Sequence, residues 1–231
     1  MQALRIIRDE HRGLAAILHG MLYLVHEIRD RRGKPNFELL GAMMHYIDAF
    51  PERFHHPKED EYLFRFLRLR HAEATQLLDR LNTEHRTGAE KIRSLQQALA
   101  RYQQGGEREF SSFLTAVEDY VAFHWDHMRT EEMEIFPLAE KYLSVSDWQA
   151  IDAAFLGHTD PMLGAESGGT YDALFTRIVN LECREGVSDR PDIAELCFHC
   201  GQQNPPEPRW QLVLNGVARP SAAVAAWASL S

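Results

Sequence analysis

The sequence predicts an all-α fold: an up-and-down antiparallel bundle of four long helices, with one or two short extra helices and a loosely ordered C-terminal tail. Apolar residues recur in alternating steps of three and four along four long segments. The connections between these segments are short and contain helix-breaking residues. No segment shows the alternation of a β-strand. Long amphipathic helices with short connections are typical of an up-and-down bundle.

The four predicted helices cover residues 4–31, 37–70, 72–104 and 107–142. Gly33 and Pro35 end the first helix, and the pair Gly105 and Gly106 ends the third. Pro51 falls inside the second, where it should kink the helix or begin a new turn.

A shorter helix should follow, with Ser146 as its N-cap and Gln149 as the capping-box partner. Residues 170–182 have the pattern of one more helix. We therefore assign residues 1–182 to the bundle domain and residues 183–231 to a poorly ordered tail, with a short helix at 221–230.

Composition excludes several classes of protein. The net charge of −9 argues against a broad nucleic-acid surface. No apolar run reaches the roughly 20 residues that span a bilayer. The N-terminus has no signal-peptide pattern, and the three cysteines, Cys183, Cys197 and Cys200, make no disulfide framework. We expect a cytoplasmic protein whose cysteines are free thiols, a zinc site at Cys197 and Cys200 being the alternative.

Histidines and glutamates occupy positions on the predicted apolar faces. A buried carboxylate or imidazole without a partner is costly, and a metal centre would satisfy many such groups at once. The candidate metal ligands are spread over the four predicted helices: His11, His55, Glu59, His85, His127 and Glu131.

The spacing of these residues has an approximate two-fold symmetry. His55 and Glu59 are four residues apart, and so are His127 and Glu131. Residues 8–18 resemble 82–92, and residues 54–64 resemble 125–136, which suggests a duplicated helix pair. Two bridging carboxylates would hold two metal ions, each with two histidines.

Mixed imidazole and carboxylate ligands suit iron and leave positions open for a small molecule, while ligands without cysteine argue against a structural zinc site. The ferritin-like dimetal pattern needs two Glu-x-x-His pairs, and only Glu52 with His55 fits it.

Four sequence blocks, EHRGLAAIL, FHHPKEDEYLF, EHRTGAE and HMRTEEMEIFPLA, resemble the motifs of bacterial hemerythrin-like, HHE cation-binding proteins. The resemblance covers roughly residues 3–180. It implies a hemerythrin-like bundle with two non-haem iron ions that bind O2, NO or related small molecules. It also implies that the six metal-binding residues of the family correspond to His11, His55, Glu59, His85, His127 and Glu131.

The sequence departs from oxygen-carrying hemerythrins at Ala89, where those proteins have a fifth histidine. The set of four histidines and two glutamates is closer to diiron proteins of nitrosative-stress response and iron–sulfur repair. Those proteins usually carry an additional N-terminal domain with a cysteine, whereas this sequence begins at the bundle.

Several neighbouring residues leave alternatives open. His124 is a possible additional ligand, a partner that orients a ligand, or a packed aromatic. Glu132 is an alternative to Glu131 as the bridging acid, although symmetry with Glu59 favours Glu131. We expect His56 on the surface or beside a ligand, and we read Asp60 as a solvated charge.

The leading functional hypothesis is a protein that binds or senses O2 or NO. The alternatives are an enzyme that reduces NO or peroxide, an iron donor in oxidative or nitrosative stress, and a structural bundle with a vestigial site. We favour binding over catalysis and expect no nucleic-acid or membrane partner. The sequence leaves the protein partner and the oligomeric state open.

Overall fold

The structure is a computed structural model that describes residues 1–157. These residues form helices and no strand, which confirms the predicted all-α class for this part of the chain. The α-helices are α1 (Ala3–Arg29), α2 (Phe37–Ala49), α3 (His56–Lys58), α4 (Arg65–Arg70), α5 (Thr75–Gly105), α6 (Glu107–Thr130), α7 (Phe136–Tyr142) and α8 (Val145–Leu156). The π-helical segments are η1 (Pro51–His55), η2 (Glu59–Phe64) and η4 (Glu131–Ile135), and η3 (Ala72–Ala74) is a 3-10 turn.

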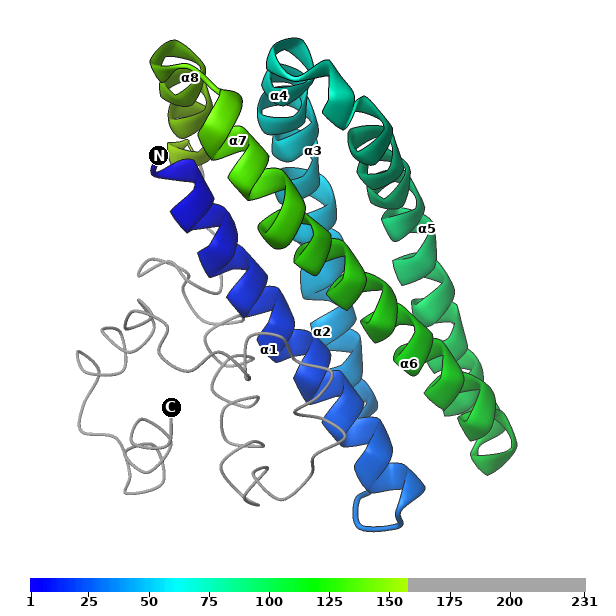
Figure 1. The fold of residues 1–231 in the computed structure, drawn as a ribbon. Helices are drawn as coiled ribbons and strands as arrows, with labels where there is room; N and C mark the ends of the chain where they lie inside the picture. The colour runs from blue at the N-terminus through cyan, green and yellow to red at the C-terminus, as the bar shows by residue number, and fades with distance from the viewer. Residues whose placement is uncertain (158–231) are drawn as a thin grey trace, which may run out of the picture. The chain divides into compact units, whose positions relative to one another are not determined.

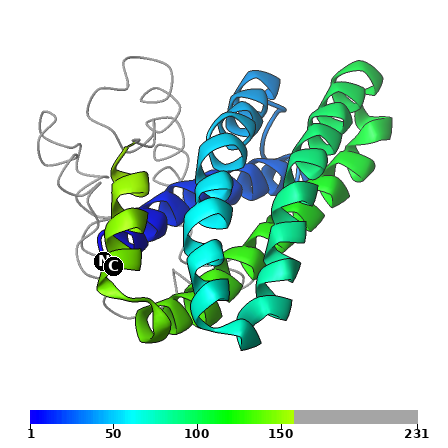
Figure 2. The same cartoon turned by 90° about the horizontal axis from the view of Figure 1, so that it is seen from above.

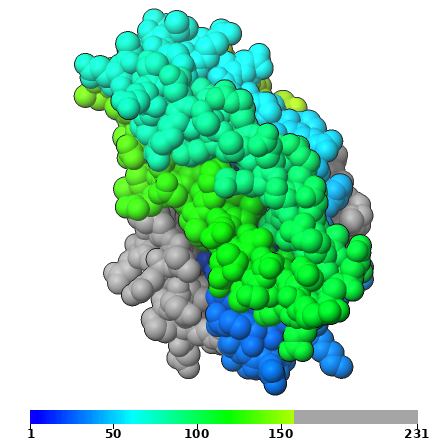
Figure 3. Space-filling model, turned by 90° about the vertical axis from the view of Figure 1, so that its right-hand side faces the viewer, coloured from blue at the N-terminus to red at the C-terminus, as the bar shows by residue number. Residues whose placement is uncertain are grey.

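Long helical segments lie side by side around a common interior (Figures 1 and 2). α1 contacts both α2 and α6, and α5 also contacts both α2 and α6. Figure 3 shows the side where side chains of α5 and α6 lie against each other over the interior. Each long segment therefore presents one face to two neighbours, and that face is the apolar one.

The second and fourth predicted helices are interrupted by π-helical segments. α2 ends at Ala49, and η1 begins at Pro51, which has no N–H to donate to a carbonyl one turn earlier. The predicted start of a new turn at Pro51 is confirmed. The second π-helical segment of 37–70, η2, was not predicted, and the expectation of one uninterrupted helix over 107–142 was wrong because η4 interrupts it. A π turn inserts an extra residue and is frequent at functional sites.

The N-cap of α8 is Ser144, so the predicted cap at Ser146 with Gln149 was wrong. The Ser144 hydroxyl accepts from the Asp147 N–H at 3.2 Å, and the Asp147 carboxylate accepts from the Ser144 N–H at 2.9 Å. Asp147 therefore takes the place usually held by glutamate or glutamine in a capping box. The predictions for residues 170–182, 221–230, the tail and the cysteines lie outside the described residues.

One apolar cluster fills the interior where α8 packs on the start of α1, joining α1, η2, α4, α5, α7 and α8. It includes Leu4, Ile7, Phe64, Phe136 and Phe155, all nearly inaccessible to solvent. It adjoins the buried polar residues, because Phe136 stacks on His11 at 6.2 Å between ring centroids. Among the described helices, none has the length and hydropathy of a membrane-spanning segment.

Candidate metal centre

The structure brings together all six residues that the sequence suggested as ligands. None is more than 5% exposed, although every one is polar: His11, His55, Glu59, His85, His127 and Glu131. They come from α1, η1, η2, α5, α6 and η4, so all four long segments contribute.

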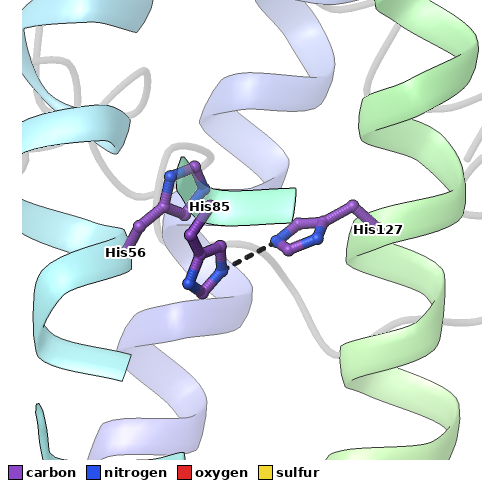
Figure 4. Close-up of side chains that lie close together, drawn as sticks. All are labelled: His56, His85 and His127. Carbon is purple, nitrogen blue, oxygen red and sulfur yellow. Dashed lines mark hydrogen bonds between the residues drawn. The ribbon is translucent and has the colours of Figure 1, made fainter. Parts of the chain in front are cut away.

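Their side chains fall into two groups with metal-ligand spacing. In the first, His11, His55, Glu59 and Glu131 each offer one donor atom, and these four atoms lie within 4.8 Å of one another. The second consists of His56, His85 and His127, with the same spacing. Figure 4 shows this second group, in which Nε2 of His85 lies 3.0 Å from Nε2 of His127.

The two carboxylates each reach both groups. Glu131 places one oxygen 3.3 Å from Nε2 of His11 and the other 3.3 Å from Nε2 of His127. Glu59 places Oε2 3.3 Å from Nε2 of His55 and 3.7 Å from Nε2 of His85. This arrangement suits two carboxylates that bridge a pair of ions. Glu132 instead contacts the outer nitrogen of His11.

Each of the four predicted histidines contacts a further carboxylate through its other ring nitrogen, Nδ1. The Nδ1 to oxygen distances are 2.9 Å for His11 with Glu132, 2.7 Å for His55 with Glu10, 2.6 Å for His85 with Asp60, and 2.9 Å for His127 with Glu84. A carboxylate on Nδ1 fixes the ring and its tautomer and leaves Nε2 for a metal. The Nε2 atoms are those that face Glu59 and Glu131.

Sequence reasoning missed Glu10 and Glu84, read Asp60 as a solvated charge, and considered Glu132 as an alternative bridging acid and not as a partner of His11. A signal was present, because each acid is adjacent in sequence to a proposed ligand. The adjacent pairs are Glu10 with His11, Glu59 with Asp60, Glu84 with His85, and Glu131 with Glu132. Each outer acid, however, contacts a histidine that lies on a different helical segment and not the proposed ligand next to it in sequence. Only the folded arrangement therefore reveals its role.

The electrostatics of the centre favour a positive charge inside it. Burial lowers the pKa of His11, but interactions with Glu131 and Glu132 outweigh it and raise that pKa to about 9. Burial also lowers the pKa of His127, yet Glu131 and Glu84 raise it to about 10. Burial and the proximity of Glu131 raise the pKa of Glu59 well above its usual value.

Unsatisfied polar atoms show that these residues fit a metal. Both carboxylate oxygens of Glu59 and of Glu131, and Nε2 of His11, are buried and make no hydrogen bond within the described part of the chain. A buried polar atom left unpaired costs about 1–3 kcal/mol. Cations between the two groups would satisfy these atoms together, and imidazole with carboxylate is a donor set that suits iron.

His56 is buried beside the candidate ligands, so of the two expected positions, on the surface or beside a ligand, the structure shows the second. It is 4% exposed, and its ring centroid lies 4.3 Å from that of His85. The reason is local geometry, since η1 ends at His55 and η2 begins at Glu59, and π turns change which residues face inward. Consecutive residues, His55 and His56, therefore both point into the interior.

His124 lies beside the centre but belongs to neither group. It is 1% exposed and stacks on His56 at 6.4 Å between ring centroids. Burial lowers the pKa of its ring well below the usual value. Neither ring nitrogen has a hydrogen-bond partner among residues 1–157. The hydroxyl of Tyr120, whose ring lies 4.5 Å from that of His124, is likewise buried and unbonded there.

Comparison with known proteins gives one positive finding. The profile of the family described as the Hemerythrin HHE cation binding domain matches residues 2–139, which is more than half of the chain. The matched range contains both groups and all the outer acids. No curated protein and no solved structure matches the chain.

Proposed function

Because this chain belongs to the hemerythrin HHE cation-binding domain family, we propose that it is a non-haem diiron protein that binds or senses O2 or NO. The observation that carries this proposal is the pair of donor groups that Glu59 and Glu131 both reach. Family membership supports a metal site of this kind. The donor chemistry supports iron as the metal.

In the proposed centre, His11 and His55 would hold one ion, His85 and His127 would hold the other, and Glu59 and Glu131 would be shared between them. When bound, a reduced iron pair supplies the electrons and open positions that binding of a diatomic gas needs. The chain's own residues fix the geometry. Glu10, Asp60, Glu84 and Glu132 orient the four imidazoles through Nδ1.

We also propose that the long segments adopt the up-and-down antiparallel order of a four-helix bundle. Their contacts support it, because α1 and α5 each pack on both α2 and α6. The short connections around Gly33 and Gly106 support it as well, since short loops join antiparallel neighbours.

Enclosure supports a ligand of few atoms. Every proposed ligand is at most 5% exposed, and the aromatic rings of Phe64 and Phe136 stack on His85 and His11. An apolar wall keeps water away from the ions and lowers the local dielectric constant. A diatomic molecule fits such an interior better than a substrate with a polar body.

The test is an absorption spectrum of the iron-loaded protein under O2, NO and azide. We expect near-ultraviolet charge-transfer bands that shift on addition of at least one of these molecules. An iron-loaded, folded protein whose spectrum changes with none of them would contradict the proposal. Steady consumption of NO or peroxide with a chemical reductant would favour an enzyme, and transfer of iron to an apo iron–sulfur protein would favour an iron donor.

A further inference from the structure

His56 shares the environment of the proposed ligands. Its ring centroid lies 4.3 Å from that of His85 and 5.5 Å from that of His127, and one donor atom from each of the three lies within 4.8 Å of the others. We propose that His56 is a fifth histidine ligand, which holds the second ion together with His85 and His127. This inference rests on the proposed diiron function and adds a residue to its site.

The first argument is the position of an acid on Nδ1. The other four histidines each make a hydrogen bond from Nδ1 to a carboxylate at 2.6–2.9 Å. Nδ1 of His56 also faces a carboxylate, Oε2 of Glu52, at the longer distance of 3.4 Å, and it makes no hydrogen bond within residues 1–157. The Glu52 side chain is only 3% exposed, and burial raises its pKa to about 7. This carboxylate lies one helical turn before His56, so it can orient the ring from the same segment.

The second argument is the contrast with His124. Both imidazoles are buried, and their rings stack on each other. Nδ1 of His56 and both ring nitrogens of His124 lack a hydrogen-bond partner within residues 1–157. Only His56, however, has a carboxylate oxygen near Nδ1, at 3.4 Å, and only His56 belongs to a donor group. Burial alone therefore does not distinguish the two residues, and the arrangement of donor atoms does.

The third argument is Gly88 on α5. A Cβ atom there would lie 2.8 Å from Oε1 of Glu52, closer than real Cβ atoms approach. Glycine inside a helix is less favourable than alanine by about 1 kcal/mol. The absent side chain at Gly88 makes room for the acid that contacts His56. The next residue of α5 is Ala89, the position where oxygen-carrying hemerythrins have a fifth histidine. Beside that position, the missing side chain of Gly88 leaves space for Glu52 of η1.

The fourth argument is the asymmetry of the duplicated helix pairs. An offset of 72 residues relates His55 to His127 and Glu59 to Glu131. The same offset takes His56 to Met128 and Glu52 to His124. The second half therefore has no counterpart of the pair Glu52 and His56. The two ions would have unequal donor sets, with two imidazoles on one and three on the other.

The experiment measures how tightly iron is held in folded protein. Ferrous iron is loaded without oxygen, and retained iron is followed while a competing chelator is added. We expect His56→Gln to release the more weakly held ion at a chelator concentration at least about tenfold lower than wild type does, since loss even of an orienting partner costs about 10–100-fold in affinity. Glu52→Gln should have a smaller effect in the same direction.

The matched control is His124→Gln, which alters a buried imidazole outside both donor groups and should release iron as wild type does. Because a substitution can also disturb folding, far-ultraviolet circular dichroism is recorded for each variant. A second variant, His56→Gly, should regain wild-type retention when free imidazole is added, because the small molecule fills the space and supplies the nitrogen.

If His56→Gln released both ions at the same chelator concentration as wild type, the assignment of His56 would be overturned and the diiron proposal would stand. Imidazole that fails to restore iron to folded His56→Gly would also overturn it. A folded wild-type protein that binds no iron would instead contradict the proposed function, and the assignment of His56 with it.

Discussion

At the scale of single residues, the outer acids connect one segment to another. Glu10 precedes His11 on α1 but contacts His55 of η1, and Glu84 precedes His85 on α5 but contacts His127 of α6. Each acid therefore fixes a ring on a different segment from its own. The positions of the imidazoles depend on the packing of the helices, and the packing in turn depends on these buried contacts.

The effect of one outer acid can be measured with Glu10→Gln. The amide keeps the size of the side chain but removes the charge that faces Nδ1 of His55 at 2.7 Å. We expect metal affinity to fall by about 10–100-fold, which is the usual effect of losing such a partner. Competition with a chelator gives the affinity. Glu90→Gln, at an exposed position of α5, is the control. Equal affinities in the two variants would show that Glu10 does not orient a ligand.

Gly88→Ala tests the space beside Glu52. Helix propensity alone would stabilise the variant by about 1 kcal/mol. The new Cβ would lie 2.8 Å from Oε1 of Glu52, so we expect that carboxylate to be displaced and the gain in unfolding free energy to be lost. Chemical denaturation of the metal-free protein measures the change. A gain of the full 1 kcal/mol would mean that Glu52 moves away freely.

The six suggested ligands could be found from the sequence because a polar residue on an apolar stripe is conspicuous. His56 could not, because regular helical periodicity places it off the face that carries His55 and Glu59. Only the π turns around it bring both histidines inward. Asp60 was misread for a related reason, since a partly exposed acid gives no sequence signal that it contacts a buried ring such as that of His85.

At the scale of elements, π-helical segments coincide with proposed ligands. η1 contains His55, η2 begins at Glu59, and η4 begins at Glu131. The sequence could predict where the long helices begin and end, because glycine and proline mark those positions. It could not predict the π turns, because no residue type specifies them and the cost of the irregular turn is balanced by tertiary contacts. Prolines were a partial local signal, because Pro51 begins η1, and Pro57 and Pro137 lie in the short helices that follow η1 and η4.

α8 depends on its capping box. Ser144→Ala removes the hydroxyl that accepts from the Asp147 N–H. Loss of such a cap typically costs about 1 kcal/mol, so we expect the unfolding free energy to fall by that amount. Denaturant titration measures the change. Gln149→Ala is the control, because Gln149 is exposed on α8 and does not cap the helix. Equal losses in both variants would contradict the assignment of the N-cap.

Asp147 predicts how stability depends on pH. Its carboxylate accepts two hydrogen bonds from Arg70, at 2.8 and 2.9 Å, and these lower its pKa well below the usual value, with Ser144 contributing. A pKa that is lower in the folded state adds stability above the unfolded-state pKa of about 4, and this stability is lost as the pH falls toward the folded-state pKa.

Wild type should therefore lose its advantage over Asp147→Asn as the pH falls below about 4. Unfolding free energies measured between neutral pH and acid give the difference. The exposed substitution Asp119→Asn serves as the control. If the difference in unfolding free energy between wild type and Asp147→Asn stayed constant with pH, the charge of the Asp147 carboxylate would not contribute to stability.

At the scale of the whole molecule, two helix pairs within residues 1–157 contribute similar but unequal sets of residues to the candidate centre. The offsets in the sequence suggested a duplicated helix pair, and in the structure each of two helix pairs places histidines and an acid at the centre. The structure adds the cross-contacts, in which acids of one element orient imidazoles of another. The apolar cluster near α8 packs to one side of the polar centre and contacts it through Phe136 and His11. The apolar cluster that stabilises the fold and the residues of the proposed metal site are therefore neighbours in one interior.

Removing the metal should lower the stability of the fold. A ligand that binds only the folded state adds about 4 kcal/mol when its free concentration is 1,000 times its Kd. We expect the iron-loaded protein to unfold at higher denaturant concentration than the protein stripped by a chelator. The change should be absent in Glu131→Gln, which lacks the carboxylate that reaches both groups. Identical unfolding curves for loaded and stripped wild type would contradict a metal bound in the core.

The central claim is that Glu59 and Glu131 bridge a pair of iron ions in the interior. The most direct test is the iron content per chain of protein loaded without oxygen, compared with the double variant Glu59→Gln and Glu131→Gln. We predict about two iron ions per wild-type chain and almost none in the folded double variant. Folded wild-type protein that binds no iron, or a double variant that binds as much iron as wild type, would contradict the claim.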